Sequence, residues 1–178
     1  MLRGQVLVHS DKLSAALADF KSNAQILSAS GADDTQTKVL LAATKVKIGG
    51  VLARQPDGVS ARDLYSEALK ITEPLARAQR PPFEALYATA DAYAGLGSLS
   101  LKESANKALA AAKRIEFLYE DRSWLQQSAA TWRQVRNPAR FDPSGFETAG
   151  PRQAERMLAQ CEARLREFGE RASEPASK

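Results

Sequence analysis

An internal repeat constrains the fold of this chain more than any other feature of its sequence. Gly49-Gly50-Val51-Leu52 aligns with Gly4-Gln5-Val6-Leu7 at an offset of 45. The same offset aligns Ala61 with Ala16, and it aligns the aromatic residue Tyr65 with Phe20. Repeats of this period are typical of solenoids, in which one repeat cannot bury its apolar face alone and therefore stacks on the next.

A third, more divergent copy follows the first two. Its first half, 90–93, aligns with 49–52 at an offset of 41, whereas its second half, 121–128, aligns with 61–68 at an offset of 60. The larger offset indicates an insertion between the two halves. We therefore expect copies at about 1–30, 33–79 and 82–136, of which the first contains only the end of its first helix.

Each copy has the sequence pattern of a helical hairpin. Alanine is abundant and runs of Val, Ile and Thr are almost absent, which favours helices over strands. A small residue at 49 or 90 allows a neighbouring helix to approach closely, and Ala61 with Tyr65 one turn later forms a hole and a knob for the next repeat. The expected fold is all-α, built from stacked antiparallel hairpins.

Capping and breaking residues predict where the helices begin and end. Ser30-Gly31 should end the first complete helix, and Ser60 should cap a helix that begins at Ala61. A helix opened by Pro81-Pro82 should end at Leu96, before Gly97. The segment 100–135 contains neither Gly nor Pro, so it is either one long helix or two helices joined by a bend.

The C-terminal region is expected to close the solenoid. A loop at 137–151, rich in Pro, Gly and Ser, precedes a helix at 152–169 that has an apolar stripe. This helix would cover the open end of the last repeat, as a capping helix must. We expect one domain over 1–171 and a disordered tail at 172–178.

Several of these residues resemble the tetratricopeptide repeat (TPR). That family places a Leu-Gly pair and a Tyr in the first helix of each repeat, and Ala, an aromatic residue and Ala in the second. The positions that match are Ile48-Gly49, Leu52, Ala61, Tyr65 and Ala68, followed by Tyr93 and Gly97. The resemblance implies a right-handed solenoid, although the copies are longer than the usual repeat.

The third copy and the region after it resemble the C-terminal TPR region of bacterial serine/threonine protein kinases. The residues that carry this likeness are 123–128, Trp132-Arg133, 137–140 and 143–146. The chain has no Gly-rich loop, His-Arg-Asp or Asp-Phe-Gly sequence, so it contains no kinase domain.

The TPR resemblance also implies a binding groove, because first helices line the concave face of such an array. Transferred by position, the groove residues are Lys45, Leu52, Gln55, Leu86, Thr89 and Tyr93. The alternative is that apolar members such as Leu52 pack between helices. The carboxylate clamp of chaperone-type repeats is not supported, since Gly49 and Ala90 occupy its Asn positions.

Composition argues against several other classes of function. The single cysteine, Cys161, and the single histidine, His9, cannot form a metal cluster, and no catalytic motif surrounds either. Cys161 lies on the apolar stripe of the last helix, so a buried small side chain is favoured over a reactive thiol. No segment has the roughly 20 apolar residues that a membrane span needs.

The charged residues predict no nucleic-acid partner. The formal net charge is +4, and basic and acidic residues alternate along most segments, as solvated helix faces do. These exclusions together lead us to expect a cytoplasmic protein without cofactor or metal. The sequence leaves its oligomeric state open.

Three functions remain. The first is a non-catalytic module that binds a protein or peptide partner in the concave groove. The second is a regulatory domain of a larger signalling protein, such as a serine/threonine kinase, that senses a ligand or peptide. The third is an enzyme of unrecognised type, for which no residue provides support.

Overall fold

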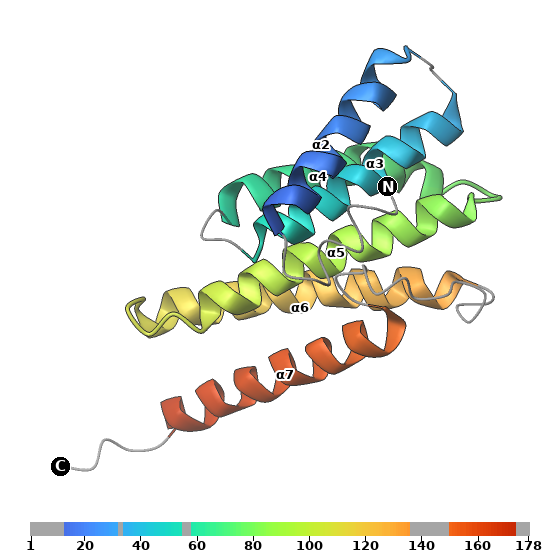
Figure 1. Cartoon of the computed structure of the whole chain (residues 1–178). Coiled ribbons are helices and arrows are strands. Elements are labelled where there is room, and N and C mark those ends of the chain that lie inside the picture. Colours follow the sequence, from blue (N-terminus) through green and yellow to red (C-terminus); the bar gives the residue numbers. More distant parts are fainter. Residues whose placement is uncertain (1–12, 32–33, 55–57, 136–149, 174–178) are drawn as a thin grey trace.

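A computed structural model describes residues 13–31, 34–54, 58–135 and 150–173 of the chain. These residues form helices and the turns between them, and no strand occurs in these ranges, so the all-α prediction is confirmed for this part (Figure 1). The helices are α2 (Leu13–Ala29), α3 (Thr35–Leu52), α4 (Gly58–Ala76), α5 (Phe83–Ser104), α6 (Ala111–Gln134) and α7 (Pro151–Ser173).

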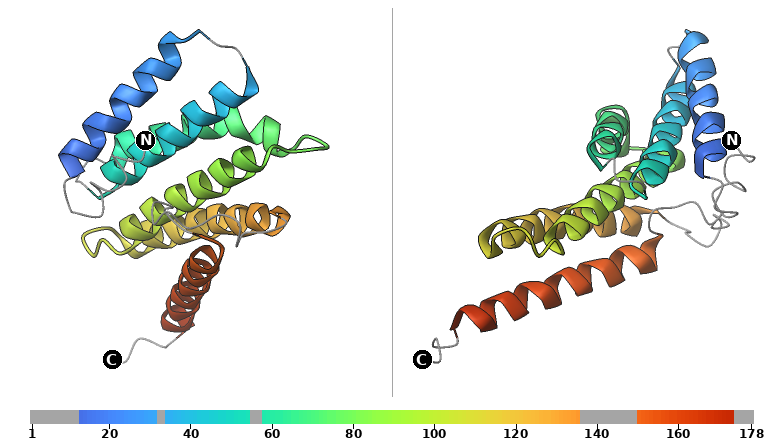
Figure 2. Two further views of the ribbon diagram at one scale, coloured as in Figure 1. Left: turned by 45° about the vertical axis from the view of Figure 1, so that its right-hand side comes forward. Right: turned by 60° about the vertical axis from the view of Figure 1, so that its left-hand side comes forward.

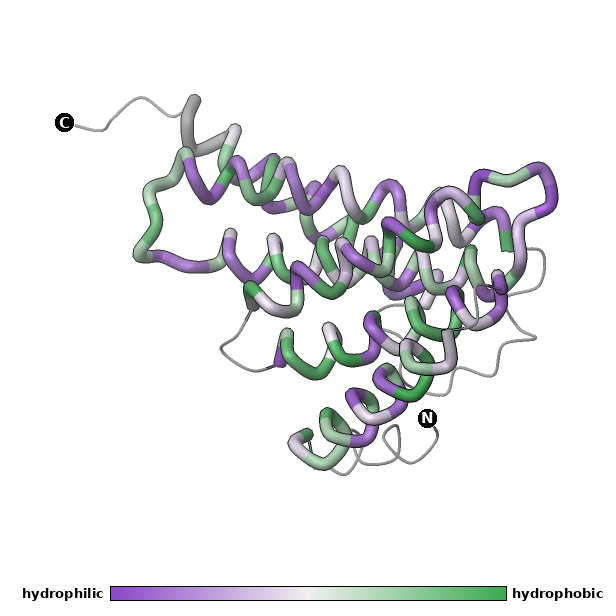
Figure 3. The backbone as a smooth tube through the Cα atoms, turned by 90° about the horizontal axis from the view of Figure 1, so that it is seen from above, coloured by the Kyte–Doolittle hydropathy of each residue, from purple (hydrophilic) through white to green (hydrophobic). Residues whose placement is uncertain are grey.

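The helices pack in the order in which they occur in the chain. Each one contacts the next, and α3 also contacts α5 while α5 contacts α7. Helix α2 lies at one end of the array and α7 lies at the other (Figure 2). Polar and apolar residues are interspersed along the helices (Figure 3). No helix in the described part is both long and apolar enough to cross a bilayer.

The ring of Tyr65 packs between two glycines and joins three helices. Tyr65, on α4, is fully buried. A Cβ atom added to Gly49 on α3 would lie 3.0 Å from Tyr65 Cε1, and one added to Gly95 on α5 would lie even closer to the same ring. The predictions that Tyr65 is a knob and that Gly49 permits close approach are therefore confirmed.

Close approach at Ala90 is confirmed as well. This residue of α5 is fully buried, and its carbonyl oxygen accepts a hydrogen bond of 2.8 Å from the Ser128 hydroxyl of α6. A side chain larger than alanine at this position would separate the two helices and break the bond.

The predicted end of α5 at Leu96 is wrong. The helix continues through Gly97 to Ser104, because Gly97 has a packing role inside the helix. A Cβ atom there would lie 2.9 Å from Leu125 Cγ of α6, so the glycine allows α5 and α6 to pack closely. The 100–135 segment forms two helices, joined by a turn in which the Asn106 side chain accepts from Ala108 N at 3.0 Å.

The remaining helix ends agree only in part with the ends predicted from capping and breaking residues. Asp34 caps α3 by accepting from Thr37 N at 2.9 Å, and this bond lowers the pKa of its carboxyl group. Gly31, after α2, has a φ of 61°. The capping role of Ser60 is wrong, since α4 already begins at Gly58.

The C-terminal helix is longer than the sequence predicts. Helix α7 extends to Ser173, so the first two residues of the expected tail are helical. Residues 1–12, most of the loop expected at 137–151 and the rest of the tail lie outside the described residues. Helix α7 packs on α6, and the small core that they share includes Leu118, Leu125 and Cys161.

Substitution of Ala61 tests the packing of α4. Ala61 is fully buried within the main core, so Ala61→Phe should overpack its site and destabilise the fold by roughly 1–3 kcal/mol. Thermal melting of the variant beside the wild-type chain measures the effect. An unchanged melting temperature would mean that Ala61 faces open space.

Candidate functional site

Five of the six groove residues predicted from the sequence are described by the structure, and these five do not form one exposed surface. Lys45, on α3, pairs with Glu67 of α4 through Nζ and Oε2 at 2.6 Å, and 23% of its side chain is exposed. Leu52 and Leu86 are buried in separate apolar clusters. Thr89 is also buried, and Gln55 lies outside the described residues.

Tyr93 connects three helices from its position on α5. Its hydroxyl donates to Glu73 Oε1 of α4 at 2.6 Å, and its ring stacks on Trp124 of α6 with the ring centroids 5.8 Å apart. Burial, followed by the bond to Glu73 and its charge, raises the pKa of Tyr93 to about 12. The phenol thus stays protonated at neutral pH and can keep donating to Glu73.

The burial of Leu52, Leu86, Thr89 and Tyr93 agrees with the alternative that these residues pack between helices. Their place in a binding site stays a prediction.

A first cavity, of about 410 Å³, lies between the first turns of α3 and α5. Apolar and polar side chains line it together: Thr35, Gln36, Val39, Leu40, Pro82 and Glu84. Val39 is buried, whereas Leu40 is 39% exposed. The sequence shows the Val39-Leu40 pair, but it does not show which of the two faces outward, because that depends on where α5 begins.

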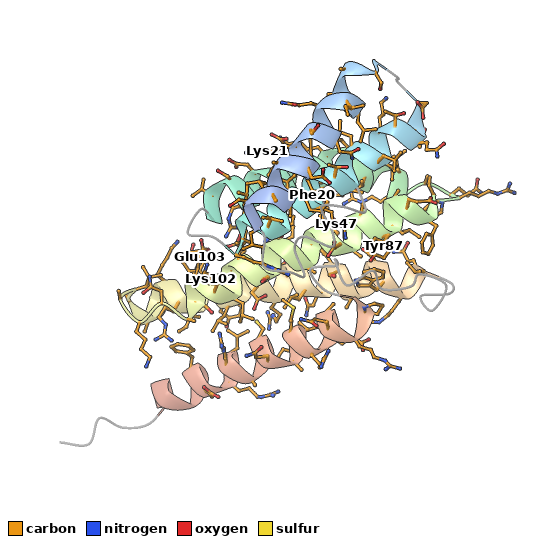
Figure 4. The ribbon with its side chains drawn as sticks, in the orientation of Figure 1. Phe20, Lys21, Lys47, Tyr87, Lys102 and Glu103 are labelled. Atoms are coloured by element: carbon orange, nitrogen blue, oxygen red, sulfur yellow. The ribbon has the colours of Figure 1, made fainter. Side chains whose placement is uncertain are left out.

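A second cavity, of about 550 Å³, lies at the opposite end of α5, where the α5–α6 turn and α7 meet. Its lining combines cations with apolar groups: Ser104, Ala105, Lys107, Arg114, Leu118, Arg164, Glu167 and Phe168. Lys102 and Glu103 mark this end of α5 in Figure 4. None of these residues was predicted as a site from the sequence, because the α5–α6 turn and its flanking helix ends meet the distant helix α7 only in the folded chain.

The carboxyl group of Asp121 is fully buried between α5, α6 and α7, and neither of its oxygens has a hydrogen-bond partner within bonding geometry in the described part. Burial raises its pKa to about 7, while the nearby Cys161 thiol and the Arg164 charge oppose that rise. Asp121 is thus neutral or charged depending on pH within the neutral range.

Cys161 has the features of a packing residue. Its side chain is fully buried, and its thiol donates to the Leu118 carbonyl oxygen over 3.1 Å. Burial, together with the nearby Asp121 carboxyl group, raises the pKa of the thiol to about 12. A buried thiol with so high a pKa is a poor nucleophile. The other residue considered for chemistry, His9, lies outside the described residues.

Metal-ligand geometry is absent from the helices and turns that are described, since they contain no cluster of three or more His, Cys, Asp or Glu side chains. Comparison of the chain with protein-family models, curated proteins and solved structures finds no significant match. The resemblances to TPR proteins and to kinase C-terminal regions therefore stay predictions.

Proposed function

We propose that the chain is a non-catalytic interaction module of the TPR type, which binds a protein or peptide partner across α3 and α5. The pattern of helix contacts supports this proposal. In an array of stacked hairpins, each first helix packs against its own second helix and against the first helix of the next hairpin. The contacts of α3 with α4 and α5, and those of α5 with α6 and α7, have this pattern.

The observation that carries the proposed binding face is the cavity between the first turns of α3 and α5. It is open to an external side chain, and Leu40 offers it a partly exposed apolar wall. Thr35 and Gln36 can exchange hydrogen bonds with a peptide backbone, and Glu84 can pair with a basic residue. An apolar anchor in a pocket with a polar rim is the usual arrangement of an interaction hot spot.

This cavity lies on the two helices that the TPR resemblance selects, but nearer to their N-terminal ends than most of the six groove residues. A partner that begins in the cavity and continues along α3 and α5 would next reach the region of Lys45. The buried Tyr93 would act indirectly, since its hydrogen bond to Glu73 and its stacking on Trp124 hold α5 against α4 and α6.

Substitution of Leu40 tests the proposal. A partner captured on the immobilised chain is identified by mass spectrometry, and its dissociation constant is then measured with purified proteins. Leu40→Asp should weaken binding about tenfold, because it places a charge in the apolar part of the cavity.

The matched control is Ile26→Asp on α2, where an isoleucine that is 66% exposed lies outside the cavity. This variant should bind within about twofold of the wild-type chain, since exposed surface away from an interface contributes little. Equal losses for the two variants, or no loss for Leu40→Asp in a chain with unchanged melting, would reject this binding face.

A further inference from the structure

We propose that the cavity lined by the end of α5, the start of α6 and the second half of α7 binds a small organic anion, whose carboxylate or phosphate group adjoins an apolar portion. The site lies at the opposite end of α5 from the proposed partner-binding cavity. It therefore stands on its own, whatever protein the α3–α5 face binds.

The charges around this cavity are unbalanced. Three cations line it, Lys107, Arg114 and Arg164, and the one acidic side chain among its lining residues is Glu167. Lys107 is exposed, and no ion pair or hydrogen bond of its side chain occurs within the described part of the chain. An anion entering the cavity would thus meet a net positive field.

Both arginines are held in place but keep donors available. Arg114 Nε donates to the Ser104 carbonyl oxygen at 2.8 Å, and Arg164 Nη1 lies 3.5 Å from the Leu101 carbonyl oxygen. A guanidinium group has about five N–H donors in a planar fork. One such contact to α5 therefore leaves each arginine with donors that a carboxylate or phosphate can use.

Helix capping explains only part of this arrangement. Arg114 and Arg164 bond to carbonyl groups near the end of α5, of which Leu101 O also accepts from the Ser104 hydroxyl at 2.8 Å, and the two cations complement the helix dipole. Capping accounts for one contact by each arginine, but it does not require Lys107 or an open volume of about 550 Å³ beside them. A ligand site accounts for all three features.

The apolar lining defines the rest of the ligand. The guanidinium of Arg114 lies over the ring of Phe168, 4.9 Å from its centroid, and this contact fixes both groups. Phe168 and Leu118 provide the cavity with apolar surface. A volume of about 550 Å³ is within the range of small-ligand pockets, so an aryl or short alkyl group can accompany the anionic group.

Calorimetric titration of the full chain tests the proposal with four probes: phenyl phosphate, phenylacetate, inorganic phosphate and benzyl alcohol. We expect saturable binding of at least one of the first two, weaker binding of inorganic phosphate and none of benzyl alcohol. Phenyl phosphate and phenylacetate distinguish a phosphate site from a carboxylate site. Added salt should weaken the binding, because the field of the exposed cations is screened.

Charge variants then locate the site. Lys107→Glu and Arg164→Gln should each weaken the tighter aryl anion about tenfold, whereas Glu167→Gln should strengthen it by about threefold. The matched controls are Lys70→Glu, on the exposed surface of α4, and Arg166→Gln, an exposed arginine of α7 outside the cavity. Both controls should bind as the wild-type chain does.

Two results would overturn the proposal. The first is the absence of saturable binding for both aryl anions in the millimolar range. The second is binding that Lys107→Glu leaves unchanged, since this exposed lysine can be reversed in charge without disturbing the core. Melting curves of every variant identify any loss that comes from unfolding, and the Lys107 and Glu167 variants decide the outcome if Arg164→Gln unfolds.

Discussion

Replacing Gly95 by alanine is expected to destabilise the fold by about 2–3 kcal/mol, although alanine is the better helix former by about 1 kcal/mol. The reason is the ring of Tyr65, which lies directly over Gly95. A Cβ atom at this position would lie 2.7 Å from Tyr65 Cε2 and closer still to Cζ and Cε1. Because the ring is fully buried, it cannot move aside without displacing α3 or α5.

Urea unfolding of four chains measures this effect: the wild type, Gly95→Ala, Tyr65→Leu and the double variant. Tyr65→Leu removes the ring and is destabilising on its own, since it leaves a cavity. In that background Gly95→Ala should cost little or should stabilise the helix. The coupling free energy between the two positions should therefore be about 2 kcal/mol or more, in the sense that the two changes compensate each other.

Alanine substitutions at two other glycines give stability changes with which the effect of Gly95→Ala can be compared. Gly49→Ala meets the same ring at 3.0 Å and should cost less than Gly95→Ala, whereas Gly169→Ala meets nothing within 4 Å and should be neutral or slightly stabilising. Equal stability of the Gly95 and Gly169 variants would show that Tyr65 does not pack against α5 as described.

The repeat period predicts this packing in part. Alignment of the copies identifies Ala61, Tyr65 and Gly49 as packing positions, because a solenoid applies the same packing requirement in each copy. It does not identify Gly95, which contacts Tyr65 from the following hairpin. That contact depends on how two copies dock, and a period within the sequence contains no direct information on docking geometry.

The burial of Tyr93 shows a second limit. Helical spacing indicates which residues share a face of α5, but it does not indicate which other helix covers that face. The hydrogen bond of Tyr93 to Glu73 and its stacking on Trp124 arise because α4 and α6 both pack there. The two cavities could not be predicted from the sequence for the same reason, since each is lined by helices that meet only in the folded chain.

The sequence contains a signal that Asp121 is buried, although the helical spacing of the residues does not reveal it. The alignment of the third copy places Asp121 at the position of Ala61, a small residue that is fully buried in the second copy. A carboxyl group at such a position has to be buried as well, and burial raises its pKa. The structure adds the neighbours that surround it.

Replacing Asp121 by asparagine is expected to stabilise the fold at pH 8 by about 2 kcal/mol and to change its dependence on pH. The carboxyl group of Asp121 has a pKa of about 7 in the folded chain, compared with an ordinary value of 3.8. Between these two values the folded chain binds more protons than the unfolded chain. Stability contributed by the neutral group is thus fully present below about pH 3.8, is lost as the pH rises from there to about 7, and changes no further above it.

The groups around Asp121 act on this titration from each side. Burial is the main cause of the raised pKa, and the charge of Glu120 on α6 adds to it. From α7, the Cys161 thiol and the Arg164 charge act in the opposite direction. From α5, the facing residue is Gly97, where an added Cβ atom would lie 3.1 Å from Asp121 Oδ1. Because Gly97 brings no donor, the charged carboxylate is poorly compensated on that side.

The full difference between the two pKa values corresponds to roughly 4 kcal/mol, and asparagine recovers only part of it, because its buried amide also needs partners. Urea unfolding at pH 4.5, 6 and 8 should show Asp121→Asn gaining on the wild-type chain at each step upward in pH. The matched control, Asp63→Asn at an exposed position of α4, should stay parallel to the wild type over this range. A constant difference between Asp121→Asn and the wild type at all three pH values would mean that Asp121 is already charged when folded. The charge would then have to be compensated by Arg164 and Cys161, and the junction of α5, α6 and α7 would be insensitive to pH.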